Sequence, residues 1–235
     1  MRRVAVLCLC LAGLVLGGGV AYAAPEIGLY LCPRCYGYRP VAPHVYADGQ
    51  ASDAQIRSAL DNLEGASARV RGVYPDLASD PEWLLCLSEA CNLSVRTGPR
   101  AMAYLDRFVF VTGRGTSVTI LAHELAHAEL HHRVGAFHFL TGAVPAWFDE
   151  GLAVYISRDT RYLSLREGRI LGCDDAGRIS PPADAGDFRR RAATESHALY
   201  TASACKVMDW LARHGGLQGV IAMEASLRRG GQFLP

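Results

Sequence analysis

Hydrophobic residues recur along this chain with two different periods, and each period predicts one type of element. From residue 52 onward, apolar side chains recur at helical spacing behind Ser52-Asp53-Ala54-Gln55, which has the pattern of a capping box. Residues 83–87 and 107–112 are short apolar runs bounded by turn-forming residues, and this pattern favours strands. The pattern thus predicts a helix followed by two strands.

A second helix is predicted directly after the strand at 107–112. Thr116 or Ser117 is placed to cap its first turn. On a helical wheel its apolar side chains lie opposite His123 and His127, and further apolar side chains flank these two histidines. We therefore expect this helix to be buried on both sides.

The C-terminal half of the chain is predicted to be mostly helical. Gly135 and Gly142 allow the chain to reverse into a third helix that starts near Pro145. Residues after Arg161 are rich in glycine, proline and charge, which predicts a long loop or a small subdomain. Helical periodicity returns at Ser196, and a last helix covers about residues 217–227.

The amino terminus has the composition of a secretory signal peptide. Within residues 1–23, two arginines precede an apolar run of about 17 residues, and Ala21-Tyr22-Ala23 forms a small-x-small cleavage site. A retained membrane anchor is the alternative, but the run is short for a spanning helix and no basic flank follows it. We expect a periplasmic or secreted protein that is not inserted in a membrane after cleavage.

Length and charge narrow the class of protein further. About 210 residues remain after cleavage, which suits one domain with a sizeable core. The chain has 24 basic and 23 acidic residues, and loss of Arg2 and Arg3 leaves 22 basic residues. Because this balance is close to neutral, we expect neither a nucleic-acid nor a membrane-surface partner.

The cysteine count indicates disulfides. Cys8 and Cys10 belong to the signal peptide, so six of the eight cysteines remain, and an even number in an exported chain favours pairing. Of the fifteen possible pairings, the short-range solution joins Cys32 to Cys35, Cys86 to Cys91 and Cys173 to Cys205.

Cys32-Pro-Arg-Cys35 also has two sharper interpretations, a redox dithiol and one half of a structural zinc knuckle. A thioredoxin-like motif needs a helix after the second cysteine, whereas Pro40 and Pro43 favour a loop here. We therefore expect residues 24–50 to form a cysteine-containing N-terminal loop segment ahead of the domain at 51–235.

The strongest chemical signal is the sequence HELAH at residues 123–127. His123 and His127 are four residues apart, so both side chains lie on one face of a helix and can reach a single ion. A catalytic zinc takes three protein ligands and a water whose pKa falls to about 7, and Glu124 is placed to accept a proton from that water. The alternative is a core helix whose histidines only satisfy local hydrogen bonds.

A third ligand is needed, and the later histidines are poorly placed to supply it. His131 is one further turn along, and its direction has drifted by about 80° from that of His123. We interpret His131, His132 and His138 as structural or surface residues. Glu150, in the helix that starts near Pro145, is the candidate, because the reversal of the chain lets that helix face the first two ligands.

HELAH followed by WFDEGLAVY at residues 147–155 resembles the gluzincin zinc peptidases, in particular the peptidase MA-like domains. The resemblance runs from Phe108 to about Gly216. It implies a zincin-like fold, zinc bound by His123, His127 and Glu150, and Glu124 as general base. Thermolysin-like members place an aspartate four residues after the ligand glutamate to orient a histidine. Val154 stands there in this chain, so either Asp149, another carboxylate or a backbone carbonyl orients the histidine instead, or the site is weaker.

The same resemblance implies a hydroxyl that stabilises the oxyanion. Tyr200 matches the tyrosine of gluzincin aminopeptidases, His197 is its competitor, and a core role is the alternative for Tyr200. In such peptidases an edge strand pairs with the extended substrate. The strand at 107–112 could be that edge strand or an ordinary core strand.

Together these features predict metal-assisted hydrolysis of a peptide or protein substrate. One alternative is a catalytically inactive zincin-fold protein that binds a partner in the cell envelope. The other is a thiol-disulfide protein that works through Cys32 and Cys35.

Overall fold

The structure is a computed structural model that describes residues 25–95, 99–173 and 179–235. The predicted signal peptide, with Cys8 and Cys10, lies outside these residues. In the part of the chain that is described, no helix is long and apolar enough to cross a membrane.

Five strands form one mixed sheet in the order β1-β2-β3-β5-β4. β2 (Val45–Asp48), β3 (Glu82–Cys86) and β5 (Phe108–Thr112) run parallel, and β1 (Tyr38–Ala42) and β4 (Ala101–Tyr104) are antiparallel edges. The predicted strand at 107–112 is therefore internal, because β5 has neighbours on both sides. The edge strand next to it is β4, which the hydrophobic pattern did not predict.

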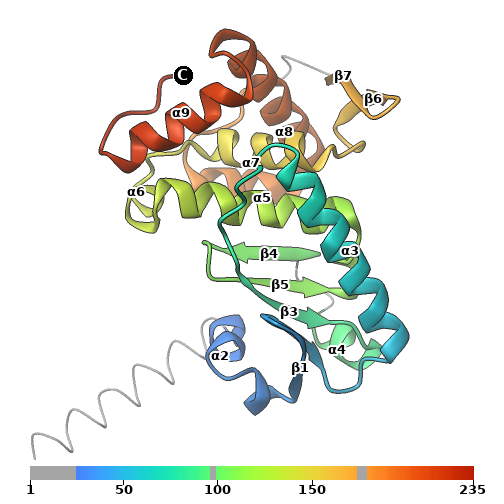
Figure 1. Cartoon of the computed structure of the whole chain (residues 1–235). Coiled ribbons are helices and arrows are strands. Elements are labelled where there is room, and N and C mark those ends of the chain that lie inside the picture. Colours follow the sequence, from blue (N-terminus) through green and yellow to red (C-terminus); the bar gives the residue numbers. More distant parts are fainter. Residues whose placement is uncertain (1–24, 96–98, 174–178) are drawn as a thin grey trace, which may run out of the picture.

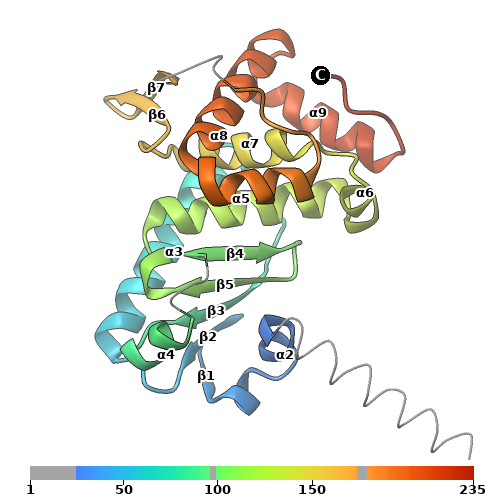
Figure 2. The same cartoon turned by 180° about the vertical axis from the view of Figure 1, so that it is seen from behind.

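Both faces of the sheet are buried, which explains why β3 and β5 have continuous apolar sequences. Alternate residues of these strands, such as Leu85 and Val109, face the main core, and their neighbours, such as Leu84 and Phe110, face a smaller cluster on the other side. α3 (Asp53–Arg71) covers the first face together with α5 (Val118–Val134), whereas α2 (Pro25–Leu31) and α4 (Glu89–Ser94) lie against the second (Figures 1 and 2).

The N-terminal segment differs from the prediction. Residues 24–50 were expected to form a loop, but from Pro25 onward they contain α2, the 3₁₀ turn η1 (Pro33–Tyr36), β1 and β2. Pro40 is compatible with β1 because an edge strand tolerates a residue that lacks an N–H group. Since β2 pairs with β3, this segment belongs to the same sheet as the rest of the chain and is not a separate unit.

The predicted starts of the first two helices agree with the structure. Ser52 and Gln55 form the capping box of α3, and the side chain of Ser117 caps α5 by accepting from the N–H of Ile120. α5 follows β5 through the short turn η2 (Gly113–Gly115).

The C-terminal half is mostly helical, as expected. It contains α6 (Ala136–Leu140), α7 (Ala146–Ser157), the hairpin β6 (Leu163–Arg166) and β7 (Arg169–Cys173), α8 (Ala185–Arg213) and α9 (Leu217–Arg228). α5 runs between the sheet and this helical half, and α7 packs between α5 and α8 (Figure 1). α8 begins at Ala185, ahead of the predicted start at Ser196, so part of the stretch predicted as a loop or small subdomain is helical; Glu195, just before Ser196, has non-helical backbone angles.

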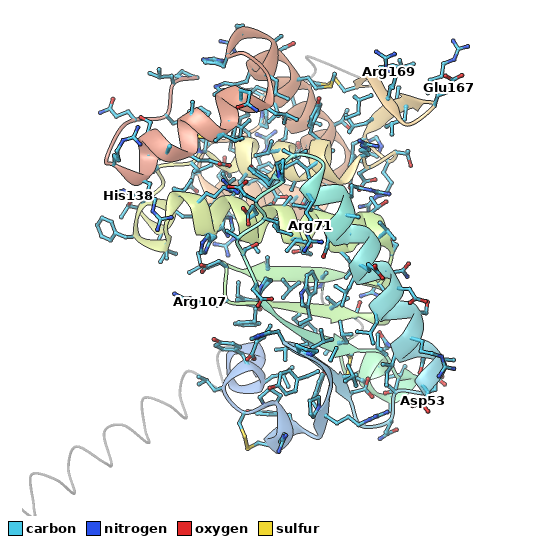
Figure 3. All side chains as sticks on the ribbon, in the orientation of Figure 1. Asp53, Arg71, Arg107, His138, Glu167 and Arg169 are labelled. Atoms are coloured by element: carbon cyan, nitrogen blue, oxygen red, sulfur yellow. A yellow bond between two sulfur atoms is a disulfide. The ribbon has the colours of Figure 1, made fainter. Side chains whose placement is uncertain are left out.

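Three disulfides join the pairs that the short-range solution predicted, Cys32–Cys35, Cys86–Cys91 and Cys173–Cys205. The third one ties the β6–β7 hairpin to α8. Charged side chains at the tip of that hairpin, Glu167 and Arg169, point away from the body of the molecule (Figure 3).

Candidate metal centre

Two histidines of α5 aim at the same point. His123 and His127 lie one helical turn apart, and their Nε2 atoms are 3.0 Å from each other. The rings meet nearly edge to face, with an interplanar angle of 82°. Ile120 and Leu130, which flank the two histidines on the helical wheel, are both buried, as predicted.

α7 brings a carboxylate to the same point. Glu150 Oε2 lies 3.4 Å from Nε2 of His123 and 3.5 Å from Nε2 of His127. The next residue, Gly151, lets α7 approach α8 closely, because a Cβ atom there would clash with the backbone oxygen of Ser203. The three residues predicted as ligands therefore converge.

The separations of these three atoms fit one metal ion. A tetrahedral ion with ligands at about 2.0–2.2 Å places its ligand atoms about 3.3–3.6 Å apart, close to the 3.0–3.5 Å seen here. Glu150 Oε2 is buried and has no hydrogen-bond partner among the described residues, although buried polar atoms are almost always paired. A bound cation would satisfy it.

Asp149 orients one of the two histidines. Its Oδ1 lies 2.6 Å from Nδ1 of His127. Because a carboxylate only accepts hydrogen bonds, Nδ1 carries the proton and the lone pair of Nε2 points at His123 and Glu150. Of the predicted alternatives, Asp149 orients His127, whereas Nδ1 of His123 is buried and has no hydrogen-bond partner among the described residues.

His131 forms a second group with His127 and Asp149. Its Nε2 atom is 3.2 Å from both carboxylate oxygens of Asp149. The 2.6 Å contact between His127 and Asp149 is too short for two ligands of one tetrahedral ion, so this group is a hydrogen-bonded network. Sequence reasoning missed this contact of His131, although its spacing from His127 repeats the spacing of HELAH.

The other two late histidines lie away from this group. His132 Nδ1 contacts Asp106 Oδ2 at 3.0 Å, and its side chain is 38% exposed. His138 lies on α6 at the surface (Figure 3). Both agree with the interpretation as structural or surface residues.

Glu124 lies beside the three converging atoms without joining them. Its side chain is buried, and Oε2 accepts a 2.7 Å hydrogen bond from the backbone N–H of Ala103 in β4. Burial raises the pKa of Glu124, against the opposing influence of His123 and His127. For Glu150, burial also opposes ionisation, but the contacts with the two imidazoles outweigh it and lower its pKa to about 2.

The structure places Tyr200, rather than His197, at this site. The Tyr200 ring centroid lies 6.2 Å from that of His123. Burial, followed by the charges of Glu150 and Glu124, raises the pKa of Tyr200, so the hydroxyl keeps its proton and can donate it in a hydrogen bond. His197 is exposed, and its Nε2 atom is hydrogen-bonded to the backbone oxygen of Arg161 at 2.9 Å.

No protein-family model, curated protein or solved structure matches this chain. Two imidazole nitrogens and a carboxylate oxygen converge with a second carboxylate beside them, and such a group can hold a divalent ion. The disulfide Cys32–Cys35 joins the residue after α2 to η1, and α2 lies at the opposite end of the molecule from α7 (Figure 1).

Proposed function

We propose that this chain is an exported, zinc-dependent metallopeptidase with a zincin-like fold of the gluzincin type. The observation that carries the proposal is the convergence of His123, His127 and Glu150 with Glu124 held alongside. Two histidines and one glutamate are the ligand set of several catalytic zinc sites, and three protein ligands leave one position open. When bound, the zinc would polarise a peptide carbonyl and lower the pKa of a water molecule.

Glu124 is assigned the role of general base. Its buried carboxylate is held by Ala103 and is not needed as a ligand, so it can take a proton from the attacking water and pass it to the leaving amine. The pKa raised by burial makes Glu124 a better proton acceptor than an exposed glutamate. Tyr200 is assigned the role of donating a hydrogen bond to the carbonyl oxygen as negative charge develops on it.

The edge of the sheet supports a peptide or protein as substrate. β4 is an edge strand, and α5 packs against it. An extended peptide can add to such an edge through main-chain hydrogen bonds, which would bring its backbone alongside Glu124. We assign the substrate-pairing role to β4 because β5, the strand predicted at 107–112, is internal.

The three disulfides support an oxidising compartment, which for an exported protein is the periplasm or the exterior of the cell. We also propose that residues 1–23 are a signal peptide and that the mature chain left after its cleavage is not inserted in a membrane.

The test measures metal content and hydrolysis together. Purified mature protein should contain about one zinc per chain and hydrolyse a mixed peptide library, and a chelator should abolish this hydrolysis. His127→Ala should lose most of the zinc. Glu124→Gln should keep the zinc and the fold but lose activity by about 100-fold or more.

Two outcomes would contradict the proposal. Full hydrolysis by Glu124→Gln would exclude the general-base mechanism. Zinc binding without hydrolysis of any library peptide would favour the inactive, partner-binding alternative. A dithiol reduction assay tests the remaining alternative at Cys32 and Cys35.

A further inference from the structure

The carboxylate of Asp149 lies between two histidines of α5. Oδ1 contacts Nδ1 of His127 at 2.6 Å, and both carboxylate oxygens lie 3.2 Å from Nε2 of His131. All three side chains are largely buried, with exposed fractions of 9% for His127, 13% for Asp149 and 6% for His131. The hydrogen bonds therefore compete little with water.

The contact with His131 limits how the carboxylate can turn. A carboxylate held at one oxygen can still rotate about its Cβ–Cγ bond, because that torsion is broad. Nε2 of His131 lies equally far from both oxygens and so opposes this rotation. The His131 ring is itself held by Phe139 of α6, with 3.6 Å between the ring centroids.

A histidine at position 131 lowers the stability of the fold if it serves only for packing. Its Nδ1 atom is buried and has no hydrogen-bond partner among the described residues. An unpaired buried polar atom destabilises a fold by about 1–3 kcal/mol, and an apolar side chain of similar size would avoid this cost. Within the described part of the chain, the polar contact of the His131 side chain is with Asp149.

We propose that His131 is a positioning residue of the metal centre. It holds Asp149 in the orientation that keeps a proton on Nδ1 of His127, and thereby keeps the Nε2 lone pair of His127 directed at the metal. His131 acts through Asp149 and His127 and is not itself a ligand. This inference rests on the proposed metal site.

The chain offers matched variants for a test. His131→Phe keeps a ring of similar size against Phe139 but removes the donor. His131→Gln keeps an N–H group near the position of Nε2. His132→Phe is the control, because His132 is the next residue of α5 and its partner is Asp106 rather than Asp149.

Zinc affinity, measured by competition with a chromophoric chelator, is the readout. His131→Phe should weaken zinc binding by about 10–100-fold, which is the usual effect of losing a group that orients a ligand. His131→Gln should restore most of the affinity, and His132→Phe should match the wild type. Thermal unfolding of the metal-free variants shows whether each one is folded.

A double-mutant cycle tests whether the effect passes through Asp149. In an Asp149→Asn background, His131→Phe should weaken zinc binding little further, because the partner that it positions has already been altered. Equal losses from His131→Phe in both backgrounds, or an equal loss in His131→Gln, would overturn the inference in favour of simple packing.

Unchanged zinc affinity in His131→Phe would overturn it as well. These outcomes differ from failure of the proposed function, in which the wild-type protein itself would not bind zinc.

Discussion

The backbone N–H of Ala103 donates a 2.7 Å hydrogen bond to Oε2 of Glu124. Ala103 lies opposite Val109 in the pairing of β4 with β5, so the edge strand of the sheet is joined directly to the helix that carries HELAH. The assigned general base is therefore oriented by a main-chain group. Among substitutions at position 103, only proline removes that donor.

Ala103→Pro should reduce turnover by about tenfold or more while zinc stays bound, because Glu124 loses the contact that orients it. An edge strand tolerates proline where the N–H group does not join the ladder. Ala103→Gly keeps the N–H group and serves as the control. Rates and zinc content of both variants are the measurement, and full turnover in Ala103→Pro would show that the contact is dispensable.

Glu150→Gln should weaken zinc binding by more than about 100-fold, because it removes the anionic ligand. Loss of a group that only orients a ligand usually weakens metal binding by no more than about 100-fold. Glu167→Gln removes one carboxylate at the tip of the β6–β7 hairpin and should leave zinc affinity unchanged. Chelator competition measures both variants. Zinc affinity in Glu150→Gln equal to that of the control would exclude Glu150 as a ligand.

Tyr200→Phe should lower turnover by about 100-fold with zinc and substrate affinity retained, because an oxyanion donor acts mainly in the transition state. His197→Ala should change turnover little, since its ring faces the backbone oxygen of Arg161. The reverse result would transfer the role to His197. Steady-state kinetics of the two variants decide between them.

Glu224 should make stability depend on pH. Burial raises its pKa to about 7, partly opposed by the hydroxyl of Tyr74, which donates a 2.6 Å hydrogen bond to it. Because the folded-state pKa lies above the unfolded value, the stabilising contribution is fully present below about pH 4.5 and is lost as the pH rises through about 7.

Glu224→Gln cannot ionise but still accepts from Tyr74. The free energy of unfolding of Glu224→Gln minus that of the wild type should therefore be about 3 kcal/mol larger at pH 8 than at pH 4.5. Urea unfolding of metal-free protein at the two pH values measures this difference. Glu64→Gln, at an exposed site of α3, controls for the loss of a charge. Parallel pH curves for the wild type and Glu224→Gln would contradict the assignment.

The disulfides should differ in their contribution to stability. Cys173–Cys205 spans 32 residues and Cys32–Cys35 spans 3. In the chain-entropy model, loss of the first should cost about 3–4 kcal/mol and loss of the second about 2 kcal/mol. Chemical unfolding of two variants, each with both cysteines of one of these disulfides replaced by serine, measures the two losses of stability. Alkylation of the unreduced wild-type protein, which should add no label, checks that all three bonds are formed.

Sequence alone determined those features of this protein that depend on neighbours a few residues apart. The capping box at Ser52 and the joint aim of His123 and His127 follow from the geometry of a single helix, which is the same wherever the helix packs. The disulfides agree with the short-range solution, which pairs cysteines that are consecutive along the chain, but the sequence by itself left fifteen pairings open.

The tertiary structure decided the features that depend on non-local packing. β1 and β2 exist because β3 offers a pairing edge, which overrides the loop-like composition of residues 24–50. The contact of His131 with Asp149 requires α5 and α7 to pack side by side. The donor from Ala103 could not be recognised in the sequence for a further reason. Every residue except proline carries a backbone N–H group, so only the pairing of β4 with β5 beside α5 determines which one reaches Glu124.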